Sequence, residues 1–199
     1  SIDIAETQGW KGLVIGNDAP NFSAGANLAM MLMLAIEQEF DELSMVIRYF
    51  QKTVMRLRYS AIPCVVAPHG LTLGGGCELT LHADSAVASA ETYIGLVEAG
   101  AGLIPGGGGT KEFVLRTSDS FYNGDPQLPK LIERFQNIAT AKVATSAHEA
   151  FENGVMHHDK DEVVVNGARV LSEAKRKVLE LHNDGYVQKP QRDDILVLG

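Results

Sequence analysis

Apolar residues occur along this chain in two patterns, short continuous runs and helix-spaced stripes. The short runs are bounded by turn-forming residues and predict strands, at residues 10–16, 62–67, 85–89, 92–94 and 161–165. Apolar positions at three- and four-residue spacing, such as Phe40, Leu43, Ile47 and Phe50, predict an amphipathic helix over residues 40–57. Further helices are predicted at residues 77–83, 128–139, 146–152 and 168–181. This alternation of strands and helices is typical of an α/β fold.

Glycine-rich loops separate several of these elements, at residues 70–76 and 95–109. Thr110 follows the second loop and is a candidate cap for the next helix. The tail, residues 183–199, contains Pro190 and mixed charge, which indicates a linker or the start of a following segment. Only a few residues precede the first strand. We therefore expect one domain at residues 1–182, and we expect it to be a fragment of a longer protein.

Composition narrows the class of protein without deciding it. The chain has 199 residues, of which 45% are hydrophobic and 21% charged, as in ordinary globular proteins. Its net charge of −8 and the lack of a Lys/Arg-rich run argue against nucleic acid as a partner. No stretch approaches the ~18 uninterrupted apolar residues that indicate a membrane span. Cys64 and Cys77 have no nearby ligand pattern, so we expect no metal site, no disulfide framework and a reducing cytoplasm.

The first candidate for chemistry is the glycine-rich loop that ends in Glu78. Three glycines, Gly74 to Gly76, enter a predicted helix there. Glycine lets a ligand approach backbone N–H groups closely, and those groups lie at the positive end of the helix dipole. A tight strand–helix turn, with Glu78 complementing the dipole, would explain the loop equally well.

Two further loops have related character. Residues 21–27 form a loop of small residues after a strand, suited to presenting backbone donors, although an ordinary connection is the simpler interpretation. Glu98 lies among leucine, valine, alanine and glycine residues. If it is buried there, its pKa should rise, as suits a proton donor. An exposed loop glutamate is the alternative.

Two common nucleotide-binding motifs are excluded. A phosphate-binding P-loop requires Gly-Lys-Ser/Thr, whereas Gly109, Thr110 and Lys111 have the reverse order. The dinucleotide pattern fails because Pro105 stands at the third glycine position. The remaining histidines and methionines are interpreted as structural, surface or pocket-wall residues: His82, His148, His157, His158, Met30, Met31 and Met33.

Taken together, three motifs resemble one known family. Ser23-Ala-Gly-Ala26, Leu73-Gly-Gly-Gly-Cys-Glu-Leu79 and Glu98-Ala-Gly-Ala-Gly-Leu-Ile-Pro-Gly106 occur in that order, as in the enoyl-CoA hydratase/isomerase (crotonase) superfamily. The resemblance covers about residues 10–180. It extends to the hydratase region of bacterial bifunctional 3-hydroxyacyl-CoA dehydrogenase/enoyl-CoA hydratases, because a long Met- and acid-rich helix follows Asn27 and a glycine run precedes Thr110.

The resemblance implies a spiral of ββα units, here lacking its first strands, and an active site. The backbone N–H groups of Ala24 and Gly75 would form an oxyanion hole for the thioester oxygen of an acyl-CoA. Glu78 would act as base toward a water molecule, and Glu98 would deliver a proton to the α-carbon. The remaining substrate-binding positions would be Ser23, Ala26, Asn27, Leu28 and Gly74. The family commonly has an acid at position 27, so contacts near the CoA adenine are expected to differ.

The resemblance thus implies hydration of trans-2-enoyl-CoA to 3-hydroxyacyl-CoA in fatty-acid β-oxidation. No metal or cofactor would be required, and NAD would bind only if a dehydrogenase region exists in the parent chain. Expected partners are the acyl-CoA substrate and either a homo-oligomer or other domains of a β-oxidation multienzyme, without stable membrane insertion. Two alternatives stay open: a Δ3,Δ2-enoyl-CoA isomerase, and a non-catalytic acyl-CoA-binding module. Isomerases commonly keep one glutamate, so the presence of both Glu78 and Glu98 favours hydration.

Overall fold

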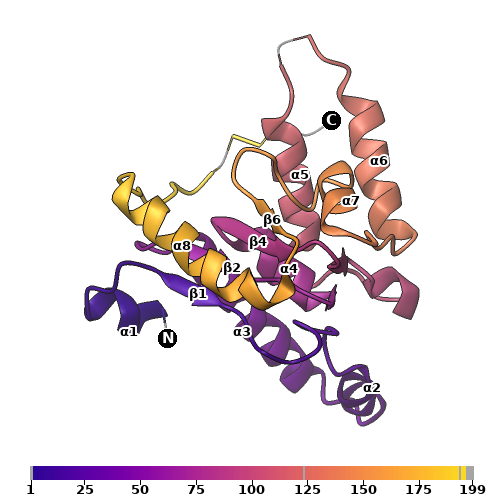
Figure 1. Cartoon of the computed structure of the whole chain (residues 1–199). Coiled ribbons are helices and arrows are strands. Elements are labelled where there is room, and N and C mark those ends of the chain that lie inside the picture. The colour runs from indigo at the N-terminus through magenta and orange to yellow at the C-terminus, as the bar shows by residue number, and fades with distance from the viewer. Residues whose placement is uncertain (1, 123, 193, 196–199) are drawn as a thin grey trace.

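Short parallel strands form two sheets in the computed structural model, which describes residues 2–122, 124–192 and 194–195 (Figure 1). The four-stranded sheet has the order β1-β2-β4-β6, and all its pairs are parallel. Its strands are β1 (Leu13–Ile15), β2 (Cys64–Val66), β4 (Ser85–Ser89) and β6 (Glu162–Val164). The second sheet pairs β3 (Leu71–Leu73) with β5 (Tyr93–Gly95), also in parallel. The five predicted strands are confirmed, but β3 is an additional strand within residues 70–76, which were predicted as a glycine-rich loop.

Helices connect and cover these strands. The four N-terminal helices are α1 (Ile2–Thr7), α2 (Leu28–Ile36), α3 (Phe40–Arg58) and α4 (Gly75–His82). The second half contributes α5 (Gly109–Asp119), α6 (Gln127–Ala139), α7 (Ala147–Glu152) and α8 (Val170–Asn183). Short 3-10 helices, η1 (Glu98–Ala101) and η2 (Gly167–Arg169), precede α5 and α8.

Strand, strand and helix recur in the same spatial order. β2, β3 and α4 form one unit, and β4, β5 and α5 form the next. In each unit the first strand joins the four-stranded sheet and the second strand joins the β3–β5 pair. Ser23 bridges in parallel to Thr72, so the chain after β1 begins a third repeat of the same kind. The predicted ββα units are confirmed, and their helix N-termini gather at one end of the β3–β5 pair.

Both faces of the four-stranded sheet are buried, as expected for parallel strands. Val65 and Val87 face α8, where Ala174 and Val178 cover them. Side chains alternate between faces, so Cys64 and its neighbours on the other face pack against the remaining helices. β1 differs from its prediction as a buried strand, because it lies at the sheet edge and is only half-buried.

Two local predictions were wrong. The long helix after Asn27 is broken into α2 and α3, because Gln38 adopts a left-handed backbone conformation with φ 59°. Thr110 is not the cap of α5: the helix begins at Gly109, one residue earlier, and no side chain of its own caps it. A cap from a different helix takes that place, as described below.

Leu81 anchors the core between the sheets and α5, and its side chain is fully buried. We expect Leu81→Ala to lower the free energy of unfolding by about 2–5 kcal/mol, because it removes buried methyl groups and leaves a cavity. Urea unfolding followed by circular dichroism measures the change. Leu128→Ala, on α6 with the leucine 56% exposed, is the matched control and should change stability little.

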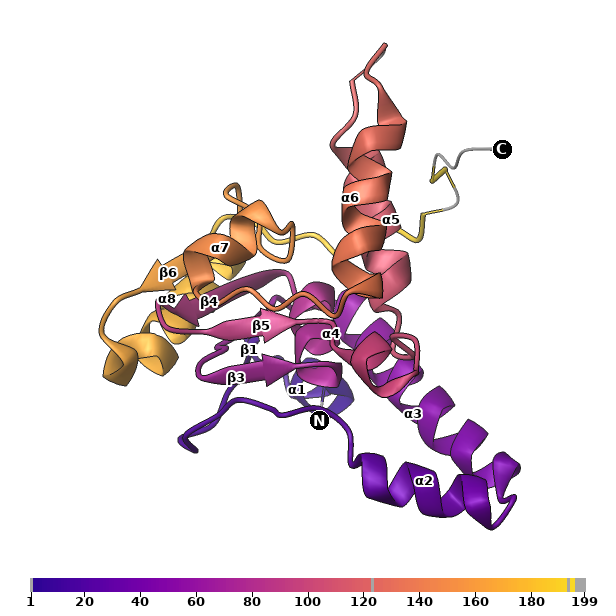
Figure 2. The same cartoon turned by 90° about the vertical axis from the view of Figure 1, so that its right-hand side faces the viewer.

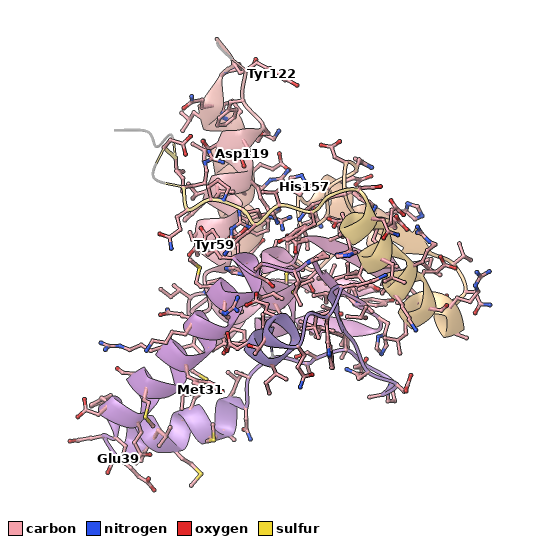
Figure 3. The ribbon with its side chains drawn as sticks, turned by 90° about the vertical axis from the view of Figure 1, so that its left-hand side faces the viewer. Met31, Glu39, Tyr59, Asp119, Tyr122 and His157 are labelled. Carbon is pink, nitrogen blue, oxygen red and sulfur yellow. The ribbon has the colours of Figure 1, made fainter. Side chains whose placement is uncertain are left out.

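Two helical arms extend from this core. Figure 2 shows α2 with the start of α3 projecting to one side, and the α5–α6 hairpin projecting to another. Figure 3 places Glu39 at the outer tip of the first arm and Met31 further in along it, with Tyr59 at the inner end of α3 and Tyr122 at the tip of the second arm. The inner ends of α3 and α5 both reach the glycine-rich loops.

The segment after α8 crosses back over the core rather than leaving it (Figure 1). The Tyr186 hydroxyl lies 3.2 Å from Oδ1 of Asp84, and the Lys189 ammonium lies 2.8 Å from the same oxygen. Arg192 then forms an ion pair of 2.8 Å with Asp119 at the end of α5. Tyr186, Lys189 and Arg192 thus dock this segment against the end of α4 and the end of α5. The prediction that the tail is a linker stays untested.

Candidate active site

The small-residue loop and the first glycine-rich loop lie against each other. A methyl group placed on Gly25 would lie 3.4 Å from the Leu73 carbonyl oxygen, and one on Gly74 would lie 3.8 Å from the Gly25 Cα. Gly74 has φ 53°, a conformation that favours glycine, and its N–H donates to the Gly95 carbonyl at 3.0 Å. The two loops are therefore in van der Waals range of each other, and the positive φ values of Gly25 and Gly74 favour glycine at both positions.

Two backbone donors at this junction have no backbone acceptor. Gly75 begins α4, and the first N–H groups of a helix lack partners within it. The carbonyl four residues earlier, that of Leu71, accepts from the Ser23 N–H instead. Within the described parts of the chain, neither the Ala24 nor the Gly75 N–H donates to a backbone carbonyl. The structure therefore places the two N–H groups that were predicted as oxyanion donors, those of Ala24 and Gly75, in adjoining loops.

Glu78 occupies the first turn of α4 and is 2% exposed. Its Oε1 accepts a hydrogen bond of 2.9 Å from the Gly109 N–H, the first residue of α5. Burial raises the pKa of Glu78, while the N–H groups of Gly109, Gly107 and Gly108 oppose the rise. The carboxylate thus caps α5 from a neighbouring helix and lies near the positive ends of two helix dipoles.

Glu98 begins η1 and faces the start of α4. A methyl group on Gly74 would lie 3.2 Å from its Oε1, which places the carboxyl beside Gly75. Its Oε2 is buried and has no hydrogen-bond partner within the described residues. Burial raises the pKa of Glu98. The Glu98 charge also raises the pKa of Glu78, so the two carboxyl groups interact across one site.

Phe50 lines this site, although the sequence indicated only an apolar helix position. Methyl groups on Gly75 and Gly107 would lie 3.3 and 2.4 Å from the ring of Phe50, which therefore contacts both glycine-rich loops. On the next residue of α3, the Gln51 side chain donates to the Gly106 carbonyl at 2.7 Å. The inner part of α3 thus supplies an apolar wall beside Glu78, which contributes to its burial. Only the three-dimensional contact reveals this role.

These features agree with comparisons to known proteins. The family model described as enoyl-CoA hydratase/isomerase matches residues 3–120. The chain belongs to the enoyl-CoA hydratase/isomerase family. An enoyl-CoA hydratase from Polaromonas sp. JS666 has the same fold, with a TM-score of 0.72 and 22% identity; the match covers 91% of this chain and 63% of that one. The crotonase-like α/β fold is thereby confirmed.

Two relatives that are similar in sequence are much longer proteins than this chain. A Bacillus subtilis (strain 168) protein described as a probable 3-hydroxyacyl-CoA dehydrogenase is 44% identical over 190 residues, which are 96% of this chain and 23% of that protein. The fatty acid oxidation complex subunit alpha of Vibrio campbellii is 39% identical over 111 residues, 54% of this chain and 15% of that one. The chain thus spans less than a quarter of either relative.

The predicted substrate-binding residues of the family site divide into two groups. Ser23 and Asn27 have local structural bonds: the Ser23 Oγ accepts from the Gly25 N–H at 3.2 Å, and the Asn27 side chain caps α2 through the Met30 N–H at 3.1 Å. Ala26 and Leu28 are exposed, Leu28 by 50%, whereas Gly74 lies at the loop junction beside Gly25. Contact of these residues with substrate stays a prediction.

Two structural features relevant to other functions are metal-ligand clusters and membrane-spanning helices. Within residues 2–122, 124–192 and 194–195, no group of three or more His, Cys, Asp or Glu side chains is arranged to hold a metal ion. In the same ranges, no helix has the length and apolar character needed to cross a membrane. Cys64 and Cys77 are buried as free thiols.

Proposed function

We propose that this chain provides the active site of an enoyl-CoA hydratase, which adds water across the double bond of trans-2-enoyl-CoA to give 3-hydroxyacyl-CoA. The observation that carries the proposal is the interaction of two carboxyl groups, those of buried Glu78 and half-buried Glu98, beside the loop junction that contains Ala24 and Gly75. The family match supports an enzyme of the crotonase type. The specific hydratase activity rests on the arrangement of the two glutamates.

In the proposed reaction the Ala24 and Gly75 N–H groups hold the thioester oxygen. Negative charge develops on that oxygen as the enolate forms, and one such donor typically lowers the barrier by about 3–4 kcal/mol. The close contact between Gly25 and Gly74 supports this role, because it brings the two loops that carry the donors together. Gly74 itself leaves room for the Glu98 carboxyl beside them.

Glu78 is proposed as the base that takes a proton from water, while the water oxygen bonds to the β-carbon. The N–H groups of Gly107 to Gly109 support this assignment, because they favour the ionised form of Glu78. Glu98 is proposed to protonate the α-carbon. Its raised pKa and partnerless Oε2 favour a carboxyl that carries a proton and delivers it.

The setting of this activity is also proposed. The printed names of the relatives support a role in fatty-acid β-oxidation, within a polypeptide that also contains a 3-hydroxyacyl-CoA dehydrogenase. NAD would belong to that second part only, and the hydratase site would need no cofactor. We propose residues 1–182 as the catalytic core and residues 183–199 as a linker or the start of a following segment, in a protein of the reducing cytoplasm.

Direct assays separate this proposal from its alternatives. The protein as its gene encodes it should hydrate crotonyl-CoA, seen as loss of absorbance of the conjugated thioester, and should convert trans-3-hexenoyl-CoA far more slowly. Preferential conversion of the 3-enoyl substrate would instead establish the isomerase. Binding of both esters without turnover of either would establish the acyl-CoA-binding module.

A further inference from the structure

A buried cluster of charges lies beside the backbone of Glu78, between α4 and α5. Its centre is Glu112 of α5, whose side chain is fully buried. Oε2 of Glu112 lies 3.0 Å from Arg58 Nη1 and 3.8 Å from Arg116 Nε, while Oε1 lies 2.7 Å from Lys111 Nζ. His82 of α4 completes the set, with its Nε2 3.5 Å from the same Oε1. We name these five residues the Glu112 cluster.

The contacts of His82 define its protonation state. Its Nδ1 lies 2.7 Å from the Glu78 carbonyl oxygen, and a carbonyl can only accept, so Nδ1 carries the proton. Burial lowers the pKa of His82 to about 4, so the ring is neutral at pH 7. Nε2 is then an acceptor, and Lys111 Nζ lies 3.2 Å from it. Lys111 therefore bridges His82 Nε2 and the Glu112 carboxylate, two acceptors that would otherwise repel.

This bridge connects the two helices that form the site. His82 holds the backbone carbonyl of Glu78 on α4, whereas Lys111 and Glu112 belong to the first turn of α5. The loop before α5 contacts both helices through Gly108. The Glu112 N–H donates to the Gly108 carbonyl at 3.0 Å, and a methyl group on Gly108 would lie 3.2 Å from His82 Nε2. The N–H groups that hold the Glu78 carboxylate are part of this loop.

We propose that His82, Lys111 and Glu112 form a positioning relay that fixes Glu78 and the N–H groups around its carboxylate in their reactive arrangement. The proposal rests on the hydratase function proposed above. None of the three side chains is assigned contact with substrate. They act through Glu78. His82 contacts its backbone carbonyl, whereas Lys111 and Glu112 fix the loop whose N–H groups bond its carboxylate.

Stability alone does not account for such a cluster. Burying several charges costs much of what their attraction returns, and well-packed apolar residues of similar volume are often as stabilising. The cluster instead holds charged groups at short distances, 2.7 Å from Lys111 Nζ and 3.0 Å from Arg58 Nη1 to the Glu112 carboxylate. Catalytic geometry tolerates little error, since displacement by about 1 Å can reduce the rate on the order of 100-fold. Precise placement of Glu78 is the function that this arrangement supplies.

Lys111→Met tests the relay, because Lys111 is its most accessible member, with a side chain 34% exposed. The groups that face His82 are Lys111 and Glu112 from α5, Arg58 from α3 and the Glu78 carbonyl. Burial, Lys111 and Arg58 lower the pKa of His82, while Glu112 and the carbonyl raise it. Removing Lys111 should therefore raise the pKa of His82 above its wild-type value of about 4, as measured by 15N NMR of the imidazole.

Kinetics supply the second measurement. In Lys111→Met, kcat for crotonyl-CoA hydration should fall about 10- to 100-fold while KM changes little, because the thioester donors are untouched. Lys111→Arg keeps the charge and the donors and should restore most of the rate. Lys175→Met, at an exposed lysine of α8, is the matched control and should match wild type. Lys111→Gln keeps a neutral donor for Nε2 and provides a second variant should Lys111→Met fold poorly.

The outcomes separate the two proposals. A wild-type protein with no hydratase activity would overturn the proposed function, and the NMR measurement would still decide the relay. Wild-type His82 that is protonated on Nε2, or charged at pH 7, would overturn the relay. So would wild-type kcat in both Lys111→Met and Lys111→Gln.

Discussion

Replacing Glu98 with glutamine is expected to reduce hydration of a short trans-2-enoyl-CoA by about 10²–10⁴-fold, the usual contribution of a general acid–base group. Glutamine keeps the shape of the side chain and removes its transferable proton. Binding of the CoA ester should change far less, since the substitution leaves the proposed thioester donors, the Ala24 and Gly75 N–H groups, in place. Steady-state kinetics and calorimetric titration with a saturated acyl-CoA measure the two effects separately.

Glu78→Gln extends the same test. Its loss of rate should be similar, and the double variant should lose far less than the product of the two single effects, because both acids act on one water molecule. Unchanged hydration in the Glu98 variant would contradict the two-glutamate mechanism and leave the isomerase and binding-module interpretations. Glu78→Gln should also weaken the cap of α5, and circular dichroism at each assay temperature controls for that effect.

Replacing Gly107 with alanine should be nearly as damaging. The added methyl group would lie 2.5 Å from Oε2 of Glu78 and 2.4 Å from the ring of Phe50, closer than real contacts allow. Relief requires that Glu78 or Phe50 move, and a shift of about 1 Å can reduce the rate on the order of 100-fold. We therefore expect kcat to fall by about that factor, measured with crotonyl-CoA.

Gly100→Ala is the matched control for this substitution. Gly100 is an exposed residue of η1, and a methyl group there would meet only the Ala141 side chain, at an ordinary 3.5 Å. The control should retain wild-type kcat. Equal losses in both variants would mean that loop flexibility, rather than the position of Glu78, limits the rate. A wild-type rate in Gly107→Ala would show that the Glu78 carboxyl needs no fixed position.

The sequence identified the motifs that lie together at this site better than it identified their surroundings, and the catalytic roles of these residues stay predictions. Glu78, Glu98 and the glycine-rich loops belong to contiguous motifs, so their residue types and order carry the information. Apolar runs and helix-spaced stripes are local patterns and predicted an α/β fold, whereas the ββα units followed only from the family resemblance, since β3 lies in a stretch interpreted as a glycine-rich loop. The break after Ile36 was missed, because it depends on a left-handed backbone at Gln38, a residue type that gives no such signal.

Residues that act through tertiary contacts could not be found in this way. Phe50 belongs to an apolar helix face like many others, and only the fold brings its ring against Gly75 and Gly107. His82 was interpreted as structural, since no neighbouring residue in the sequence indicates Lys111 or Glu112 as its partners. The cap of α5 was wrongly assigned to Thr110, because a carboxylate from another helix can serve the same N–H groups as a local side chain.

The position of α8 has a consequence for how the protein is made. One face of the four-stranded sheet is covered by Val170, Ala174 and Val178 of α8. Three of the four strands, β1, β2 and β4, are synthesised before residue 90, and only β6 comes later. That face therefore stays exposed to solvent and to other chains until Val178 has left the ribosome. Parallel strands paired across long stretches of sequence assemble slowly and are prone to aggregation meanwhile. The catalytic loops all precede α8, so the active site is encoded early and becomes stable only when the last helix closes over the sheet.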